Sequence, residues 1–311
     1  MIKEREMVHI ILATYNGEQY VAEQLKSILD NTWQNVKITV CDDGSKDHTI
    51  EIVKEYIMRY PEKVELHQNE ENKGVKLNFL EAVRKSPYKY LMFSDQDDYW
   101  YQEKIEMTIK KLLAMEKKYG TEKPLVVFAD ATVTDERRNV IHPSFHRSGK
   151  LNCRALSLNR MLMENKLIGC TMAMNGAVKN YVTSLPKQLR MHDWWIALIA
   201  TSFGKIGYLD KALLDYRQHG NNVVGNVNFL TYIKNRLLSI AKQHLVLKET
   251  VAQGEEFLKL FGTQLSSENL YILKEFVQMN HTNFFMKRYL FIKHKYYKTG
   301  LIRNIGVFFL L

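Results

Sequence analysis

Three aspartates crowd into four positions of the stretch FSDQDDYW, which covers residues 93–100. Carboxylates as close as those of Asp95, Asp97 and Asp98 raise one another's proton affinity unless a cation or several hydrogen-bond donors compensate. The apolar residues 90–93 predict a buried strand that ends at this cluster. A turn in which Asp98 caps the next helix is one interpretation. We favour the other, a site for Mg²⁺ or Mn²⁺, because hard cations bind carboxylate and phosphate oxygens together.

Two further polar stretches also come directly after predicted strands. They are TYNG (residues 14–17) and DDGS (residues 42–45), and each follows an apolar, β-branched run. Plain turns would account for either stretch. Alternatively, Asp43 accepts a hydrogen bond from the imide N–H of a nucleobase, and Tyr15 stacks on the same base. Together with the acidic cluster, the two stretches predict that a nucleoside diphosphate binds across the edge of a sheet.

Strand and helix signals alternate along the first half of the chain. Short apolar, β-branched runs indicate strands, and apolar residues at helical spacing indicate the helices between them. The alternation predicts right-handed crossovers, a mostly parallel sheet, and ligands bound beyond the carboxyl ends of its strands. The expected strands are residues 8–13, 36–41, 64–68, 90–93 and 125–130, and the expected helices are residues 18–31, 49–59, 77–85 and 104–119.

The second half of the chain is less regular, and its period changes near residue 230. An apolar helix is expected to begin at residues 191–195 and to run through residue 202. From about residue 230 onward the apolar spacing is helical throughout. We therefore expect an α/β sheet domain over residues 1–230 and a small helical region over residues 231–311.

Composition limits the class of protein. The chain has 311 residues, of which 46% are hydrophobic, enough for a full core with an appendage. Its three cysteines, Cys41, Cys153 and Cys170, lack metal-type spacing and fit a reducing cytoplasm. We expect no signal peptide and no membrane-spanning helix. The net charge is +10, and from residue 232 onward Lys and Arg exceed acidic residues by seven, which predicts an anionic partner.

Several motifs occur in an order that resembles glycosyltransferase family 2, whose nucleotide-sugar-binding fold is called GT-A. The motifs are ATYNG, CDDGSKD, SDQDD, IGCTMAMN, HDWW and YRQHGNN, and the resemblance covers roughly residues 7–225. The forms SDQDDYW, MHDWW and YRQHGNNVVG, with the terminal KYYKTGLIRNIGVFFLL, are most similar to bacterial rhamnosyltransferases of cell-surface polysaccharide assembly. The resemblance implies a GT-A fold and inverting, metal-dependent transfer of a sugar from a nucleotide-sugar donor. It further implies rhamnose from dTDP-rhamnose and a lipid-linked or polysaccharide acceptor.

The resemblance also assigns roles to single residues. Asp193 occupies the position of the catalytic carboxylate, although His192 stands where the family often has Glu, and the role of this histidine is open. Capping of a helix that begins at Trp194 is the other interpretation of Asp193. The catalytic carboxylate takes the proton of the acceptor hydroxyl, and the cation stabilises the departing diphosphate. The implied donor-binding residues are Thr14, Tyr15, Asn16, Asp43, Lys76, Asp95 and Gln96, and the implied metal ligands are Asp97, Asp95 and His219.

Other classes of protein share parts of this pattern. A metal-dependent phosphohydrolase of the haloacid-dehalogenase kind also uses Asp-x-Asp at a strand end, but on its first strand and normally followed by Thr. A nucleotide-binding adaptor at the membrane surface would keep Tyr15 and Asp43 without needing Asp193. A family member that uses a different nucleotide sugar is a further alternative. We expect no nucleic-acid binding, because basic residues near the C-terminus alternate with aliphatic and aromatic stretches, and the sequence predicts no oligomeric state.

The end of the chain predicts contact with a membrane surface. After Glu275 there is no acidic residue, and six Lys and Arg alternate with aromatic and aliphatic residues over residues 284–311. A basic, aromatic-rich segment too short to span a bilayer is typical of helices that lie among lipid headgroups. The alternative is that these aromatics form core of the helical region. We expect a peripheral protein on the cytoplasmic face of the membrane, near a lipid-linked acceptor.

Overall fold

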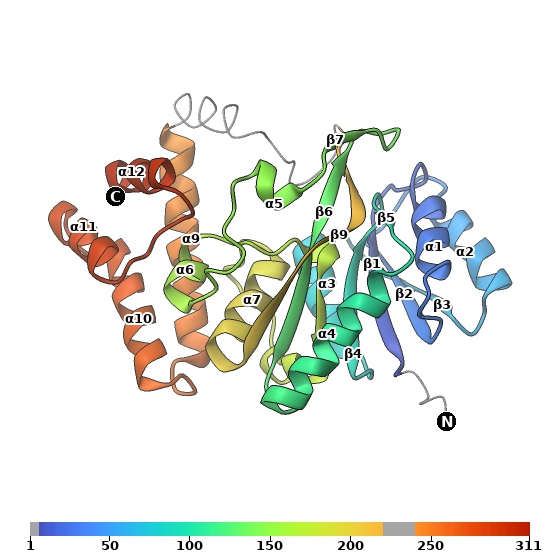
Figure 1. The fold of residues 1–311 in the computed structure, drawn as a ribbon, viewed down its shortest axis with the longest axis horizontal. Helices are drawn as coiled ribbons and strands as arrows, with labels where there is room; N and C mark the ends of the chain where they lie inside the picture. Colours follow the sequence, from blue (N-terminus) through green and yellow to red (C-terminus); the bar gives the residue numbers. More distant parts are fainter. Residues whose placement is uncertain (1–5, 220–239) are drawn as a thin grey trace. The chain divides into compact units, whose positions relative to one another are not determined.

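The computed structural model describes residues 6–219 and 240–311 (Figure 1). The chain forms two compact units, and each is assembled from separate stretches of the sequence. The domain boundary expected near residue 230 lies outside the described residues. The first unit comprises Met1–Phe145, Leu167–Leu185 and Lys205–Gly225, and the second comprises His146–Lys166, Pro186–Gly204 and Asn226–Leu311.

A mixed β-sheet runs through the first unit (Figure 1). Its strands lie in the order β3-β2-β1-β4-β8-β6-β9-β5, and β7 pairs with β6. The strands from β3 to β4 are parallel, which confirms the predicted alternation of strands and helices. These strands are β1 (Val8–Thr14), β2 (Val36–Asp42), β3 (Val64–Gln68) and β4 (Tyr90–Asp95), and the helices are α1 (Val21–Leu29), α2 (Thr49–Arg59), α3 (Val75–Lys85) and α4 (Lys104–Tyr119).

The rest of the sheet contains β6 (Leu125–Thr134), which the sequence predicts over residues 125–130, and four strands that it does not predict. β8 is antiparallel to both β4 and β6, while the long strand β9 is parallel to β6 and antiparallel to β5. β8 has only three residues, and the first eight residues of β9 are exposed or half-buried, so neither strand gives an apolar signal. These elements are β5 (Tyr99–Trp100), β6 (Leu125–Thr134), β7 (Val140–His142), α5 (Phe145–Ser148), η1 (Gly169–Thr171), β8 (Ala173–Asn175), η2 (Gly176–Tyr181) and β9 (Lys205–Arg217).

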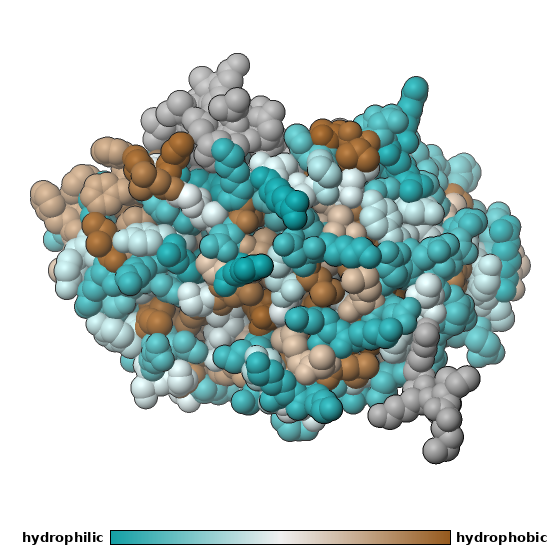
Figure 2. Space-filling model, viewed as in Figure 1, coloured by the Kyte–Doolittle hydropathy of each residue, from teal (hydrophilic) through white to brown (hydrophobic). Residues whose placement is uncertain are grey.

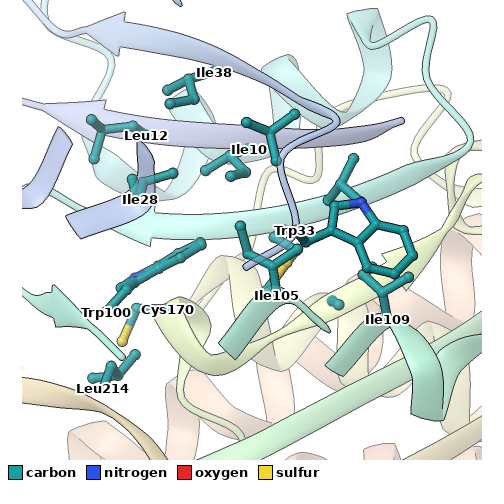
Figure 3. Close-up of a cluster of buried hydrophobic side chains, with 14 of the residues drawn as sticks. Ile10, Leu12, Ile28, Trp33, Ile38, Trp100, Ile105, Ile109, Cys170 and Leu214 are labelled. Carbon is teal, nitrogen blue, oxygen red and sulfur yellow. The ribbon is translucent and has the colours of Figure 1, made fainter. Parts of the chain in front are cut away.

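Apolar side chains of the sheet and of helices α1 and α4 form the core of the first unit (Figure 3). Ile10 and Ile38, on neighbouring strands, and Ile28 of α1 are fully buried. Burial of a side chain of this size contributes about 1.5–3 kcal/mol. Trp100 of β5 is also buried, and its backbone N–H donates to the hydroxyl of Ser27 at 3.0 Å. The core therefore holds α1 next to the strand that follows the acidic stretch.

The second unit is helical among its described residues, as expected for the end of the chain. Trp195 of α7 is buried and packs against Phe257 and Phe261 of α9, with ring centroids 5.3 Å and 6.2 Å away. At the start of α10, the Ser266 hydroxyl accepts the backbone N–H of Asn269, a stabilising N-cap. The helices are α6 (Leu158–Met163), α7 (His192–Phe203), α9 (Ile240–Phe261), α10 (Ser267–Val277), η3 (Gln278–Asn280), α11 (Phe284–Lys293) and α12 (Leu301–Leu310).

Candidate active site

An aspartate and a histidine that are far apart in the sequence meet beyond the ends of two strands. Asp97 follows β4 and His219 follows β9, and His219 Nε2 lies 2.6 Å from Asp97 Oδ2. Only 14% of the aspartate side chain and 9% of the histidine side chain are exposed. Two groups that can both bind a metal ion are therefore held in contact and largely shielded from water. The structure brings together two of the three predicted metal ligands.

Strand pairing and ring stacking explain how His219 reaches Asp97. β5 pairs with β9 so that Tyr99 lies opposite Asp215, and Asp97 precedes the first of these strands while His219 follows the second. The His219 ring stacks on the ring of Tyr20, with centroids 5.1 Å apart and an interplanar angle of 28°. The imidazole is therefore oriented toward the acidic stretch by the protein itself.

The donor atoms at this place suit a hard divalent cation. Asp95 ends β4, and its carboxylate, that of Asp98 and the Cys170 thiol offer ligand atoms within 4.8 Å of one another. Burial and the neighbouring aspartates raise the pKa of Asp98, and burial raises the pKa of Cys170. A protonated acid and a thiol are poor metal ligands. The two carboxylates and the imidazole of Asp95, Asp97 and His219 are donor types compatible with Mg²⁺ or Mn²⁺, and metal binding by this set stays a prediction.

Asp98 does not cap the following helix, which corrects one interpretation of the acidic stretch. Helix α4 begins at Lys104 after Glu103, and no side chain caps it. Asp98 is instead 1% exposed, and its carboxylate lies within 4.8 Å of the Cys170 thiol. Lys104 is also fully buried, its Nζ lies 3.3 Å from the centroid of the Trp100 ring, and burial lowers its pKa to about 7. The third aspartate of the stretch is therefore a core residue.

The side-chain amide of Gln96 binds the main chain of Tyr15 through two hydrogen bonds. The N–H of Tyr15 donates to Gln96 Oε1 at 2.8 Å, and Gln96 Nε2 donates to the carbonyl of Tyr15 at 3.1 Å. Gly17 makes room for this contact, since a Cβ there would lie 2.2 Å from Gln96 Oε1. Tyr15 is 48% exposed, so its ring is accessible for stacking on a base. Gln96 thus positions the loop of Tyr15, and its contact with the donor stays a prediction.

Asp43 connects the end of β2 to the beginning of helix α3. Its carboxylate accepts hydrogen bonds from Asn69 Nδ2 at 3.0 Å and from the backbone N–H groups of Lys73 and Gly74, both at 2.8 Å. An ionised carboxylate offers about four acceptor positions, which leaves one for the imide N–H of a base. Lys76 lies in the first turn of α3, where the backbone N–H groups and the helix dipole favour phosphate. The predicted roles of Asp43 and Lys76 are compatible with this geometry.

Thr14 and Asn16 join the two donor-side loops to each other. The Thr14 hydroxyl donates to Asp42 Oδ1 at 2.9 Å, and Thr14 itself is buried. The N–H of Asn16 donates to Ser45 Oγ at 2.9 Å, and Asn16 Oδ1 accepts the N–H of Lys46 at 2.8 Å. These contacts shape the loops that carry Tyr15 and Asp43. Direct donor binding by Thr14 and Asn16 stays a prediction.

Asp193 lies in the second unit, in the first turn of α7. The helix begins at His192, its N-cap residue is Met191, and no side chain caps it, so Asp193 is not the cap of a helix that begins at Trp194. Asp193 Oδ1 accepts the backbone N–H of the next residue, Trp194, at 2.6 Å. The Trp194 indole donates to the carbonyl of Met161 at 2.6 Å, which holds this turn in place. Burial lowers the pKa of His192 to about 3, so this histidine is neutral at physiological pH. The catalytic role of Asp193 stays a prediction.

Glu23, Arg138 and Asp215, near the Asp97–His219 contact, were missed by sequence reasoning. The Glu23 carboxylate bridges Arg138, at 3.0 Å, and Arg217. Burial opposes ionisation of Glu23, but hydrogen bonds from the two arginines lower its pKa. Arg138 also pairs with Asp215 at 2.9 Å, and the Arg217 guanidinium lies 4.7 Å from the centroid of the Tyr20 ring. These residues come from α1, β9 and the turn after β6, and only Arg217 stands in a recognisable motif, YRQHGNN.

Comparison with known proteins agrees with the resemblance seen in the motifs. The sequence profile of glycosyl transferase family 2 matches residues 9–167, just over half of the chain. The dTDP-rhamnosyl transferase RfbG of Shigella flexneri is 29% identical over 232 residues, which are 70% of this chain and 75% of that protein. The putative teichuronic acid biosynthesis glycosyltransferase TuaG of Bacillus subtilis (strain 168) is 23% identical over 228 residues, 73% of this chain and 84% of that protein.

Among solved structures, the mannosyltransferase PcManGT from Pyrobaculum calidifontis in complex with GDP-Man and Mn²⁺ has a similar fold. The TM-score is 0.54 at 14% sequence identity, and the match covers 98% of this chain and 79% of that one. At this identity the likeness concerns the fold alone. The matched family profile covers the parallel strands and the acidic stretch described above. The chain therefore belongs to glycosyl transferase family 2 and has its α/β GT-A fold, followed by C-terminal helices.

Proposed function

We propose that the protein is an inverting, metal-dependent glycosyltransferase of cell-surface glycan assembly. It transfers rhamnose from dTDP-rhamnose to a lipid-linked or polysaccharide acceptor. The contact between Asp97 and His219 at the end of a family 2 sheet is the observation that carries the proposal. The names of RfbG and TuaG support a rhamnosyl donor and a surface polysaccharide, and the contents of the PcManGT complex support a nucleotide sugar and a metal ion.

In this proposal the donor lies across the loops that follow β1, β2 and β4. The accessible ring of Tyr15 stacks on the base, and Asp43 accepts the imide N–H of the base. Lys76 meets a phosphate from the first turn of α3. Asp95, Asp97 and His219 hold Mg²⁺ or Mn²⁺, which supplies positive charge to the departing diphosphate when bound.

Asp193 serves as the general base of the proposed reaction. It accepts the proton of the acceptor hydroxyl as the hydroxyl oxygen attacks the anomeric carbon and the nucleoside diphosphate leaves from the opposite face. Attack opposite the leaving group inverts the configuration of the anomeric carbon. Because burial keeps the adjacent His192 neutral, no imidazolium forms an ion pair with the carboxylate and lowers its basicity.

The donor and the reaction class are tested by one transfer experiment. The full chain is incubated with Mn²⁺, a synthetic acceptor sugar on a lipid diphosphate, and separately dTDP-rhamnose, UDP-glucose, UDP-GlcNAc or GDP-mannose. We expect transfer from dTDP-rhamnose with inverted anomeric configuration, measured by mass spectrometry and NMR of the product. If the enzyme transfers preferentially from another nucleotide sugar, the proposed donor, dTDP-rhamnose, is wrong. Phosphate release without acceptor would indicate a phosphohydrolase, and donor binding without product would indicate an adaptor.

The two last helices turn their apolar side chains outward. On α12, Leu301 and Phe309 are 75% and 76% exposed, whereas Arg303 is buried, forms an ion pair with Glu164 at 3.7 Å and donates to the carbonyl of Lys150. Figure 2 shows hydrophobic side chains grouped over α11 and α12. The exposed apolar residues of the two helices are Phe284, Phe285, Met286, Tyr289, Ile292, Leu301, Ile302, Ile305 and Phe309. We call this set the apolar terminal face.

The structure corrects the expectation that all six Lys and Arg of residues 284–311 lie on the surface. Arg288, like Arg303, is buried, and its guanidinium lies 3.3 Å from the centroid of the Phe284 ring and 5.4 Å from that of Phe308. Two of the six expected surface cations are therefore part of the second unit's interior. Phe291 and Tyr296 are also buried, so part of the segment is core. The remaining cations are Lys287, Lys293, Lys295 and Lys298.

We further propose that the apolar terminal face inserts among the lipid headgroups of the cytoplasmic leaflet. No helix in residues 6–219 or 240–311 is long and apolar enough to span a bilayer. Short helices with outward apolar residues and flanking lysines can lie in the interface instead. Each lysine near an anionic leaflet contributes about 1 kcal/mol, and the exposed aromatic and aliphatic side chains add their burial. This arrangement would keep the enzyme next to a lipid-linked acceptor.

Point substitutions test the membrane proposal without removing core residues. We expect the double variant Phe285→Ser/Phe309→Ser to bind phosphatidylglycerol vesicles about 10-fold less tightly, since two exposed apolar side chains are lost. The measurement is co-sedimentation over a range of lipid concentrations. Met58→Ser is the matched control, because Met58 is 76% exposed on α2 in the first unit. Equal sedimentation of the double variant and the wild type would show that the apolar terminal face does not bind lipid.

A further inference from the structure

Arg138 has a backbone conformation that residues with a side chain rarely adopt. It lies in the turn between β6 and β7 with φ of 65°, in the left-handed region where glycine is favoured. The carboxylate of Asp135 builds the turn by accepting the N–H groups of Arg137 at 2.9 Å and Asn139 at 2.8 Å. The turn itself does not require arginine. The presence of arginine at this position is therefore explained by the contacts of its side chain.

The Arg138 side chain reaches three separate elements. Its Nε donates to Asp215 Oδ2 on β9 at 2.9 Å, and its Nη1 donates to Glu23 Oε1 on α1 at 3.0 Å. Its guanidinium also stacks on Tyr99 of β5, 3.3 Å from the ring centroid. Tyr99 and Asp215 are direct cross-strand partners. One guanidinium therefore holds both members of a strand pair and connects them to a helix.

This strand pair is the one that brings the predicted metal ligands together. Asp97 lies two residues before Tyr99, and His219 lies four residues after Asp215. A second connection from Arg138 to His219 runs through Glu23. Glu23 forms an ion pair with Arg217, and the Arg217 guanidinium contacts the Tyr20 ring. The His219 ring in turn stacks on this Tyr20 ring. Arg138 thus restrains the Asp97 side and the His219 side of the site at once.

We propose that Arg138 is a positioning residue for the metal site, holding His219 opposite Asp97 without touching the ion. The inference rests on the proposed metal-dependent function. Arginine suits the task because its planar fork binds two carboxylates and stacks on a ring, which a lysine ammonium does not do. Partly exposed ion pairs of this kind contribute little to folding stability, and 31% of the Arg138 side chain is exposed. The main effect of Arg138 is therefore on ligand geometry.

The test measures Mn²⁺ affinity directly, by electron paramagnetic resonance of free Mn²⁺ in titrations of the full chain. Arg138→Gly suits the left-handed turn, so we expect an unchanged or higher Tm. We expect its dissociation constant for Mn²⁺ to rise about 10-fold, the lower end for groups that orient metal ligands. Arg138→Lys should lose less Mn²⁺ affinity than Arg138→Gly, because a lysine can re-form one of the two ion pairs. Lys150→Gly is the matched control, since Lys150 is a cation with φ of 49°.

The outcomes separate this inference from the proposed function. A weaker Mn²⁺ affinity in Arg138→Gly with intact Tm, partly recovered in Arg138→Lys and absent in Lys150→Gly, supports the positioning role. Wild-type affinity in Arg138→Gly would overturn that role alone, and so would equal losses in the Arg138 and Lys150 variants. A wild-type chain that binds no Mn²⁺ and transfers sugar in chelator would remove the metal site from the proposed function as well.

Discussion

Replacing Asp193 with asparagine is expected to lower kcat by about 10²- to 10⁴-fold, the usual contribution of a general base. The amide has the size of the carboxylate but cannot take the proton of the acceptor hydroxyl. Donor binding should stay nearly unchanged, since the donor loops belong to the first unit and Asp193 to the second. Steady-state kinetics with varied acceptor and donor give kcat, and calorimetric titration gives the affinity for the nucleotide.

The asparagine variant also separates catalysis from the local hydrogen bond to Trp194. Asp193 Oδ1 accepts the N–H of Trp194, and the amide oxygen of asparagine can accept the same hydrogen bond. A normal Tm is therefore expected for Asp193→Asn, whereas Asp193→Ala should also lose this local hydrogen bond, about 0.5–1.5 kcal/mol. Wild-type turnover in Asp193→Asn would leave this residue with a structural role only.

A second large loss of activity is expected from Asp97→Asn, because the metal site loses a charged ligand. We expect a decrease of about 10²- to 10³-fold, similar to the removal of one group that stabilises the charge of a transition state. The concentration of Mn²⁺ needed for half-maximal activity should rise as well. Initial rates measured over a range of Mn²⁺ concentrations give both quantities.

Metal removal and a surface variant complete the test of Asp97. A chelator should abolish wild-type transfer, and added Mg²⁺ or Mn²⁺ should restore it. Asp30→Asn is the control for loss of an acid, since Asp30, just after the end of α1, forms a surface ion pair with Lys26 at 2.6 Å. Full wild-type activity in chelator would eliminate the metal ion from the proposed reaction.

The first half of the fold could be predicted because its signals are local. Residues 8–119 alternate strands with helices of regular apolar spacing, and the observed elements differ from the expected ones by at most a few residues, apart from the unpredicted two-residue strand β5. β9 could not be predicted, because its first eight residues are exposed or half-buried and include Lys205, Asp210 and Lys211. Its last five residues are buried only through pairing with β6 and β5.

The site could be predicted only in part, because its residues are brought together by contacts between distant parts of the sequence. Asp97 and His219 lie 122 residues apart; the spacing of the aspartates pointed to Asp97, but only the family resemblance pointed to His219. Sequence reasoning could not find the bridge from Arg138 to Glu23 and Asp215, since no local pattern relates a turn, a helix and a strand. Asp98 shows the converse error. The motif places Asp98 beside two candidate metal ligands, but in the structure its side chain is buried in the core.

Because each of the two units is built from alternating stretches of the sequence, their folding is affected by the order of synthesis on the ribosome. His146–Lys166 and Pro186–Gly204 of the second unit emerge before the strand β9 that completes the first unit's sheet and long before the final helices. Trp195 must wait about 60 residues for its partner Phe257, roughly 3–12 s at ordinary elongation rates. During that interval α7 can contact α6 but lacks its packing partners on α9 in the nascent chain. Neither unit is built from one continuous stretch of the chain, and the second unit completes its packing only after the final helices have been synthesised.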